Sequence, residues 1–134
     1  MKIVLAGDGE VGLYLAQELS KEDHEITMIV PNSELVESIE GHTDVKAIVG
    51  DPTFISVQKR MNVKKADLMI SALHDERINL LSAAIAKKLG AKKVISRINN
   101  LEYLSDENSK LFREKRADSQ VRPDFLAASA IIDL

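Results

Sequence analysis

The chain has 134 residues, of which 45% are hydrophobic and 29% are charged, and its formal net charge at pH 7 is −3. This length fits one domain with its own core and leaves no room for a second, substrate-binding domain. The slightly acidic balance gives no indication of a nucleic-acid partner or of binding to an anionic membrane surface. The chain has no cysteine, which excludes disulfides and thiolate metal sites. Because no apolar run is long enough to span a membrane and no signal peptide precedes the first strand, we expect a cytoplasmic protein with no direct membrane insertion.

Strand-like apolar runs alternate with helical patterns along the chain. The expected strands are Lys2–Ala6, Glu25–Val30, Lys46–Val49, Leu68–Ala72 and Lys93–Arg97. The expected helices are Val11–Lys21, Ser33–Glu40, Ile55–Met61, Glu76–Leu89 and Leu101–Lys115. This alternation predicts an α/β fold with a Rossmann-like, doubly wound, mostly parallel sheet and helices on both faces. We expect a single domain over residues 1–134, the strand order 3-2-1-4-5, and a ligand site at the switch point beside the first strand.

Two of these helices carry boundary signals. Ser33 stands just before the helical pattern that starts at Glu34, which is typical of an N-cap. Gly90 comes shortly after Lys87 and Lys88, which favours a helix end there. Glycine tolerates the left-handed backbone of a helix end, and the positive charges of the lysines interact favourably with the negative end of the helix dipole.

A G-x-G-x-x-G turn, made by Gly7, Gly9 and Gly12, connects the first expected strand to the first expected helix. In this context the pattern indicates a dinucleotide phosphate turn. The first glycine permits the tight turn, the second lets a pyrophosphate approach the backbone, and the third lets helix and strand pack closely. The helix N-terminus then offers N–H groups to an anion. The alternative is a glycine-rich turn that binds no ligand.

Two positions depart from the usual nucleotide site. An acidic residue is expected at the end of the second strand to bind the ribose hydroxyls, and Val30 stands there, followed by Pro31 and Asn32. Asp8 and Glu10 lie inside the glycine turn and would repel phosphate unless they point to solvent. A missing carboxylate removes hydrogen bonds worth roughly 1.5–3 kcal/mol.

Several further segments are more specific than the glycines. They are Met1–Gly12, Gly50-Asp51, Ala66–Ala72, the D-E-x-x-N block from Asp75 to Asn79, and Ala86–Asn100, which contains an R-x-N-N block. Together they resemble the N-terminal nucleotide-binding domain of the Trk potassium-uptake regulatory subunits, also called the RCK or KTN domain. The resemblance implies a Rossmann domain that dimerises, binds NAD or NADH or else ADP, ATP or AMP, and regulates a potassium channel or transporter in the membrane.

The resemblance also implies site residues. The cofactor-binding residues it implies are Gly7, Asp8, Gly9, Glu10, Val11 and Gly12 in the phosphate turn, Val30 and Asn32 after the second strand, Gly50 and Asp51 after the third, Ala72, Leu73, Asp75 and Asn79 after the fourth, and Arg97 at the end of the fifth. Because Val30 replaces the family's acidic residue, we expect weak nucleotide binding that discriminates poorly between ribose variants.

Some of these residues also have simpler interpretations. Asp75 and Glu76 favour a helix N-terminus whether or not a ligand binds, and Asp51 fits a plain loop cap. Arg97 is either a surface residue at a strand end or part of a polar network with an acidic side chain or a phosphate. His24, His42 and His74 fall on separate loops or strand starts, without a carboxylate cluster nearby, so we expect no metal site.

The last segment, residues 123–134, is apolar nearly all round. A helix of this kind must be buried on most sides. It is either the last core helix or, as the resemblance favours, a crossover helix in a homodimer or higher homo-oligomer. Because the sequence stops without a C-cap signal, we expect that this helix is truncated.

The favoured function is therefore a non-enzymatic regulatory domain that binds a nucleotide. One alternative is the Rossmann half of an NAD-dependent oxidoreductase, although Tyr14 and Tyr103 lack catalytic neighbours and no nucleophile constellation is evident. The other is a purely structural assembly domain with a degenerate nucleotide site.

Overall fold

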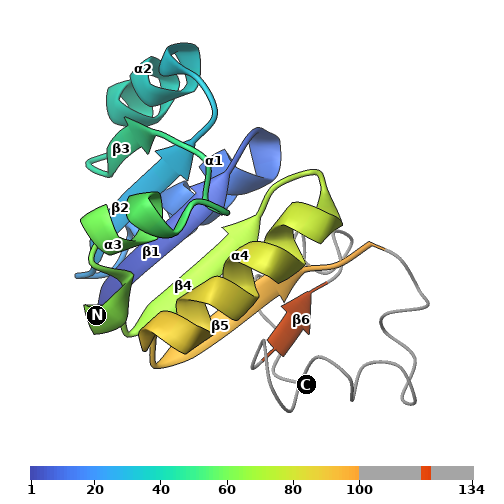
Figure 1. Cartoon of the computed structure of the whole chain (residues 1–134). Helices are drawn as coiled ribbons and strands as arrows, with labels where there is room; N and C mark the ends of the chain where they lie inside the picture. Colours follow the sequence, from blue (N-terminus) through green and yellow to red (C-terminus); the bar gives the residue numbers. More distant parts are fainter. Residues whose placement is uncertain (100–118, 122–134) are drawn as a thin grey trace.

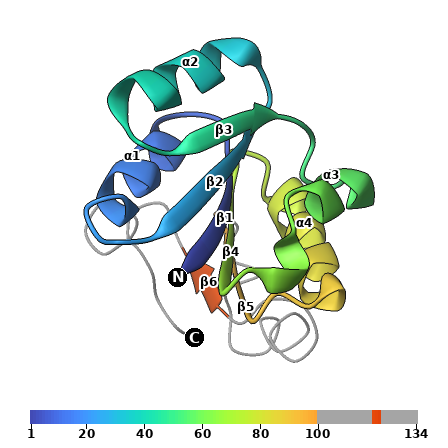
Figure 2. The ribbon, with the colours of Figure 1, turned by 90° about the vertical axis from the view of Figure 1, so that its left-hand side faces the viewer.

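The computed structural model describes residues 1–99 and 119–121, and the chain forms three layers (Figure 1). The strands are β1 (Lys2–Gly7), β2 (Glu25–Val30), β3 (Lys46–Val49), β4 (Leu68–Ala72), β5 (Lys93–Arg97) and β6 (Ser119–Val121). The helices are α1 (Glu10–Leu19), α2 (Ser33–His42), α3 (Ile55–Arg60) and α4 (Glu76–Leu89), with a 3₁₀ turn η1 (Val63–Lys65). Figure 2 shows α1 and α2 on one side of the sheet and α3 and α4 on the other.

The sheet order is β3-β2-β1-β4-β5-β6, and every pairing is parallel. The predicted fold class and the predicted order 3-2-1-4-5 are thus confirmed. β6 is an additional strand, which pairs with β5 through Ile95–Arg97. Its three residues include the polar Ser119 and Gln120, and so short a strand has no apolar periodicity from which it could be predicted.

The described residues form two apolar core clusters, one on each face of the sheet. Ile3 and Leu5 of β1 belong to the cluster under α1 and α2, whereas Val4 and Ala6 belong to the cluster under α3 and α4. All four are fully buried, because successive residues of a strand point to opposite faces and here both faces are covered. This two-sided burial explains the continuous apolar run before the glycine turn.

The helix ends agree with the sequence at one position and differ at another. Gly90 ends α4 in the left-handed conformation, with a φ of 115°, as predicted. The N-cap of α2 is Asn32 and not Ser33, which is the first helical residue. The Asn32 Oδ1 accepts a hydrogen bond from the Leu35 N–H at 2.9 Å. Both residue types suit an N-cap, and the extended backbone of Asn32 decides between them.

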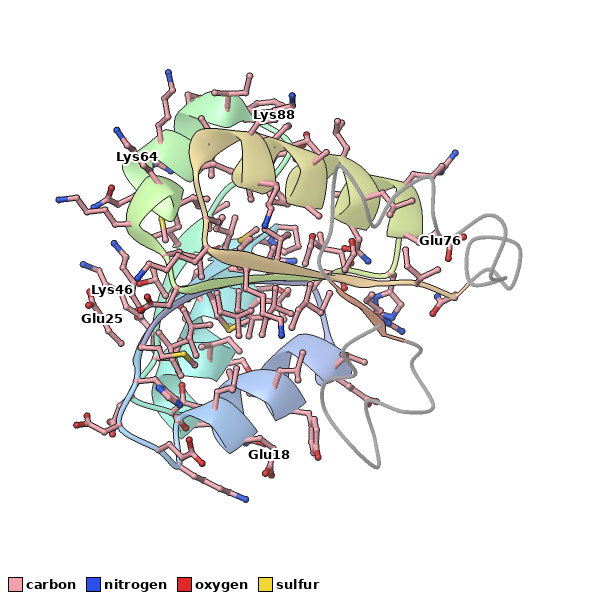
Figure 3. The ribbon with its side chains drawn as sticks, turned by 90° about the horizontal axis from the view of Figure 1, so that it is seen from below. Glu18, Glu25, Lys46, Lys64, Glu76 and Lys88 are labelled. Atoms are coloured by element: carbon pink, nitrogen blue, oxygen red, sulfur yellow. The ribbon has the colours of Figure 1, made fainter. Side chains whose placement is uncertain are left out.

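Charged side chains lie mainly on the outer faces and ends of the helices (Figure 3). The last turns of α3 and α4 carry Lys59 and Arg60, and Lys87 and Lys88, where cations oppose the negative end of the helix dipole. In Figure 3, Lys64 and Lys88 lie on the α3 and α4 side, whereas Glu18 lies on the α1 side.

Two expectations concern the C-terminal part of the chain. The helices expected over Leu101–Lys115 and over residues 123–134 lie outside the described residues. Within the described part of the chain, no helix combines the length and the apolar character needed to cross a bilayer.

Candidate functional site

The glycine turn lies between β1 and α1, at the switch point of the sheet, where the chain returns from β3 to place β4 on the other side of β1. A Cβ atom on Gly7 would lie 2.9 Å from the Gly12 Cα, and one on Gly12 would lie 3.1 Å from the Gly7 Cα. These two glycines therefore allow α1 to pack directly on β1. Gly9 precedes α1 in an extended conformation and makes no side-chain cap, so the first N–H groups of α1 face the open end of the site. This cradle fits a phosphate group.

A hollow of about 340 Å³ opens at the carboxyl ends of β2, β3 and β4. It is lined by Pro31, Gly50, Asp51, Pro52, Leu73 and Ile78. Three of the predicted cofactor-binding residues, Gly50, Asp51 and Leu73, thus lie around one cavity. A pocket in this position, at the switch point of a parallel sheet, is where ligands of doubly wound folds bind.

Two predicted residues, Val30 at the end of β2 and Asn32 shortly after it, have other contacts. Val30 is only 1% exposed and packs in the apolar cluster under α1 and α2, so its side chain does not line the hollow. The Asn32 side chain caps α2. Pro31, between them, is the residue of this segment that lines the hollow.

Asp8, the second residue of the turn, is joined to His74 in the loop between β4 and α4. The His74 main-chain N–H lies 3.1 and 3.2 Å from the two carboxylate oxygens, and the imidazole Nδ1 lies 2.7 Å from Oδ1. The sequence pattern did not predict this contact between His74 and a single carboxylate. The two residues are 66 positions apart, and the parallel pairing of Gly7 with Ala72 brings them together.

Asn79 of α4 is fully buried, and its side chain makes four hydrogen bonds to other described residues. Its Oδ1 accepts from the Leu73 N–H and the Ser71 hydroxyl, and its Nδ2 donates to the Leu73 and Arg97 carbonyls. An asparagine amide offers two donors and two acceptor sites, so this side chain has no capacity left for a ligand. Asn79 positions the ends of β4 and β5 instead.

Arg97, at the end of β5, is buried, with 8% of its surface exposed. Its Nη1 donates to the Leu73 carbonyl over a long 3.4 Å, and its Nε has no hydrogen-bond partner among the described residues. Burial lowers the pKa of Arg97, and the nearby Asp8 carboxylate opposes that shift. The alternative of a plain surface residue is wrong, because only 8% of the Arg97 surface is exposed. A buried guanidinium with an unused donor is suited to an anionic ligand.

Asp51 and Asp75 stabilise local turns, and the neighbouring Glu76 joins α4 to the segment after β5. The Asp51 Oδ1 accepts from the Thr53 N–H at 2.9 Å and from its hydroxyl at 2.7 Å. Asp75 caps α4 by accepting from the Arg77 N–H at 2.9 Å, and the hydrogen bonds from Arg77 lower the pKa of this carboxyl. Glu76 accepts from the Asn99 N–H at 2.7 Å.

A parallel, doubly wound sheet with a glycine turn at its switch point and a hollow beside it defines a Rossmann-type domain. The TrkA-N domain model matches residues 3–123, and the chain belongs to this family.

Curated relatives agree with the family assignment. The chain is 38% identical over 104 residues to a Trk system potassium uptake protein TrkA homolog from Archaeoglobus fulgidus. The aligned region covers 78% of this chain and 23% of that protein. It is 31% identical over 137 residues to the Trk system potassium uptake protein TrkA of Haemophilus influenzae. This alignment covers 100% of this chain and 30% of that protein. The chain thus spans about a quarter to a third of these relatives.

Solved structures share the fold. The TrkA-N domain of the inner membrane protein YbaL from Escherichia coli superposes with a TM-score of 0.77 at 19% identity, covering 95% of this chain and 90% of that one. The NAD(P)-binding domain of an exopolyphosphatase-related protein from A. fulgidus gives 0.76 at 19% identity, covering 96% and 92%. The GsuK channel bound to NAD gives 0.70 at 18% identity, covering 90% of this chain and 21% of that one.

Proposed function

We propose that this domain binds an adenine nucleotide, with NAD or NADH as the first candidate and ADP, ATP or AMP as alternatives. We further propose that binding regulates potassium transport by an associated membrane channel or transporter, in the cytoplasm and as a homodimer or higher oligomer. The observation that carries the proposal is the glycine cradle at the switch point, with the 340 Å³ hollow beside it.

Each part of the site has a role in this proposal. The main chain at Gly9 and the N-terminus of α1 bind the phosphates, and Arg97 supplies a positive charge close to the turn. The hollow between Pro31, Asp51 and Leu73 receives the adenosine. Relatives named as Trk potassium uptake proteins support the regulatory role, and a channel solved with NAD and also with ADP supports the ligand class.

The ligand is tested by calorimetry and thermal shift with NAD, NADH, ADP, ATP and AMP at millimolar concentration. A ligand that binds only the folded state stabilises it by roughly 2.7 kcal/mol at a hundredfold excess over its Kd. We expect at least one nucleotide to raise the melting temperature. If none does, the result supports the alternative of a purely structural assembly domain with a degenerate nucleotide site.

A matched pair of glycine variants localises the ligand. Gly9→Ala places a Cβ where the pyrophosphate approaches and is expected to abolish the shift, whereas Gly41→Ala, in α2 with open space around it, preserves it. Hydride transfer from NADH by the domain in the presence of candidate substrates would instead support the oxidoreductase alternative.

The regulatory role is tested separately in the host cell. Removing the gene is expected to change potassium or rubidium uptake, the intact gene to restore it, and the Gly9→Ala form to restore it without its response to nucleotide. Unchanged uptake after removal of the gene would overturn this part of the proposal.

A further inference from the structure

The Asp8–His74 pair lies directly over the phosphate turn. A Cβ atom built on Gly9 would lie 3.1 Å from the His74 Cε1 and 3.8 Å from its Nδ1. The imidazole therefore covers the second glycine of the turn, which is the place where a pyrophosphate approaches the backbone in sites of this type.

The β4–α4 loop presents two donors to the Asp8 carboxylate, the main-chain N–H of His74 and its imidazole Nδ1. This is a small anion-binding arrangement, and a carboxylate of the protein itself occupies it. The His74 side chain is 70% exposed and that of Asp8 is 22% exposed. An ion pair with one partner in solvent contributes little to stability, so an incoming anion can displace it.

We propose that Asp8 occupies the position of a ligand phosphate and that His74 is a phosphate-binding residue, which exchanges the Asp8 carboxylate for the phosphate when a nucleotide enters. This inference rests on the proposed function and adds a residue and a form of regulation to it. Asp8 then acts as a competitor within the protein, and His74 makes binding depend on pH.

The direction of the pH effect follows from the charges around the imidazole. Asp8 faces His74 from the β1–α1 turn, Arg97 lies near Asp8 at the end of β5, and Asp75 in the same loop is paired with Arg77. Histidines change their charge between about pH 5 and 8, and a positively charged imidazole attracts a pyrophosphate more strongly than a neutral one does. Nucleotide binding is therefore expected to tighten as the pH falls.

NAD is a suitable probe, because its pyrophosphate does not titrate in this range, and adenosine is the control ligand without phosphate. Calorimetry compares the unmodified chain with His74→Gln, Asp8→Asn and, as a matched histidine control, His42→Gln. We expect the Kd for NAD to fall about fivefold from pH 8 to pH 6 in the unmodified chain and in His42→Gln. His74→Gln is expected to bind NAD more weakly at pH 6 and without pH dependence.

Asp8→Asn is expected to bind NAD about threefold more tightly at both pH values, since it removes the competing charge. The Kd for adenosine is expected to be the same in all four proteins. Thermal denaturation without ligand confirms that each variant folds, and the His74 ring resonances of the unmodified chain are expected to shift when NAD is added.

Two results would overturn this inference and leave the proposed nucleotide site intact. One is a Kd for NAD that changes neither with pH nor with His74→Gln, and the other is that the His74 resonances do not shift when NAD binds. If neither NAD nor adenosine binds to any of the four proteins, the proposed nucleotide site is wrong and this inference falls with it.

Discussion

Gly7 and Gly12 hold β1 and α1 in direct backbone contact, since a Cβ atom on Gly7 would lie 2.9 Å from the Gly12 Cα. The Gly12 Cα belongs to the main chain, and the position of a Cβ atom is fixed by its own backbone, so no side-chain rotation can relieve the clash. Gly9 differs, because its closest neighbour is the exposed ring of His74, which can turn away. The three glycines of one motif thus have separable physical roles.

This separation predicts different outcomes for three alanine substitutions. Gly7→Ala is expected to lower the free energy of unfolding by about 1–3 kcal/mol, as overpacking against fixed atoms does. Gly9→Ala is expected to change it by less than about 0.5 kcal/mol. Gly41→Ala, near the end of α2, is expected to raise it by about 0.5–1 kcal/mol, because alanine favours the helix. Urea denaturation measures all three, and a Gly7→Ala protein as stable as the unmodified chain would contradict the packing role.

Asn79 is expected to contribute far more to stability than Ser82, although both are buried polar residues of α4. Asn79→Ala leaves the Leu73 N–H and the Arg97 carbonyl without the partner seen here, and each such group costs about 1–3 kcal/mol. The Ser82 hydroxyl has no partner among the described residues, so Ser82→Ala is expected to be neutral or slightly stabilising. Chemical denaturation of the two variants checks this, and equal losses of stability would contradict it.

Asp67 is expected to make the fold sensitive to acid. Its carboxylate accepts from the Lys2 N–H at 2.8 Å and pairs with Lys92 at 3.1 Å, and these contacts lower its pKa from the ordinary value of 3.8. Because the pKa is lower in the folded state, the contribution to stability is present above pH 3.8 and is lost as the pH falls below that value.

The test is the melting temperature between neutral pH and pH 3, measured for Asp67→Asn and for Asp23→Asn, an exposed aspartate in the loop before β2. The melting temperature of the Asp67→Asn protein is expected to fall less on acidification than that of the unmodified chain. The Asp23→Asn protein is expected to follow the unmodified chain, and identical acid profiles for all three would rule out the role given to Asp67.

The assembly prediction comes from the sequence of the last segment. Apolar residues dominate Asp124–Leu134, and an exposed apolar surface of this kind normally marks an interface. Deleting residues 125–134, or replacing Phe125 and Ile131 with Glu, is expected to convert a dimer into a monomer with an intact core. Sedimentation and circular dichroism measure this. A monomeric unmodified chain, or loss of the fold on deletion, would show that the segment belongs to the core.

The sequence by itself determined the strands β1 to β5, their order, the glycine turn and the helix end at Gly90. Each of these depends on neighbouring residues: on apolar periodicity, on glycine spacing, or on the backbone freedom of one residue. The strand order followed from the rules for parallel α/β folds, which need only the sequence of elements.

Tertiary structure alone decided the chemistry around the turn. The Asp8–His74 pair and the hydrogen bonds of Asn79 join residues from different strands and loops. The burial of Arg97 likewise depends on how these elements pack together. Val30, the last residue of β2, faces the core under α1 and α2, whereas Pro31, which follows the strand, lines the hollow. Such contacts depend on the register of the sheet, which no local pattern contains.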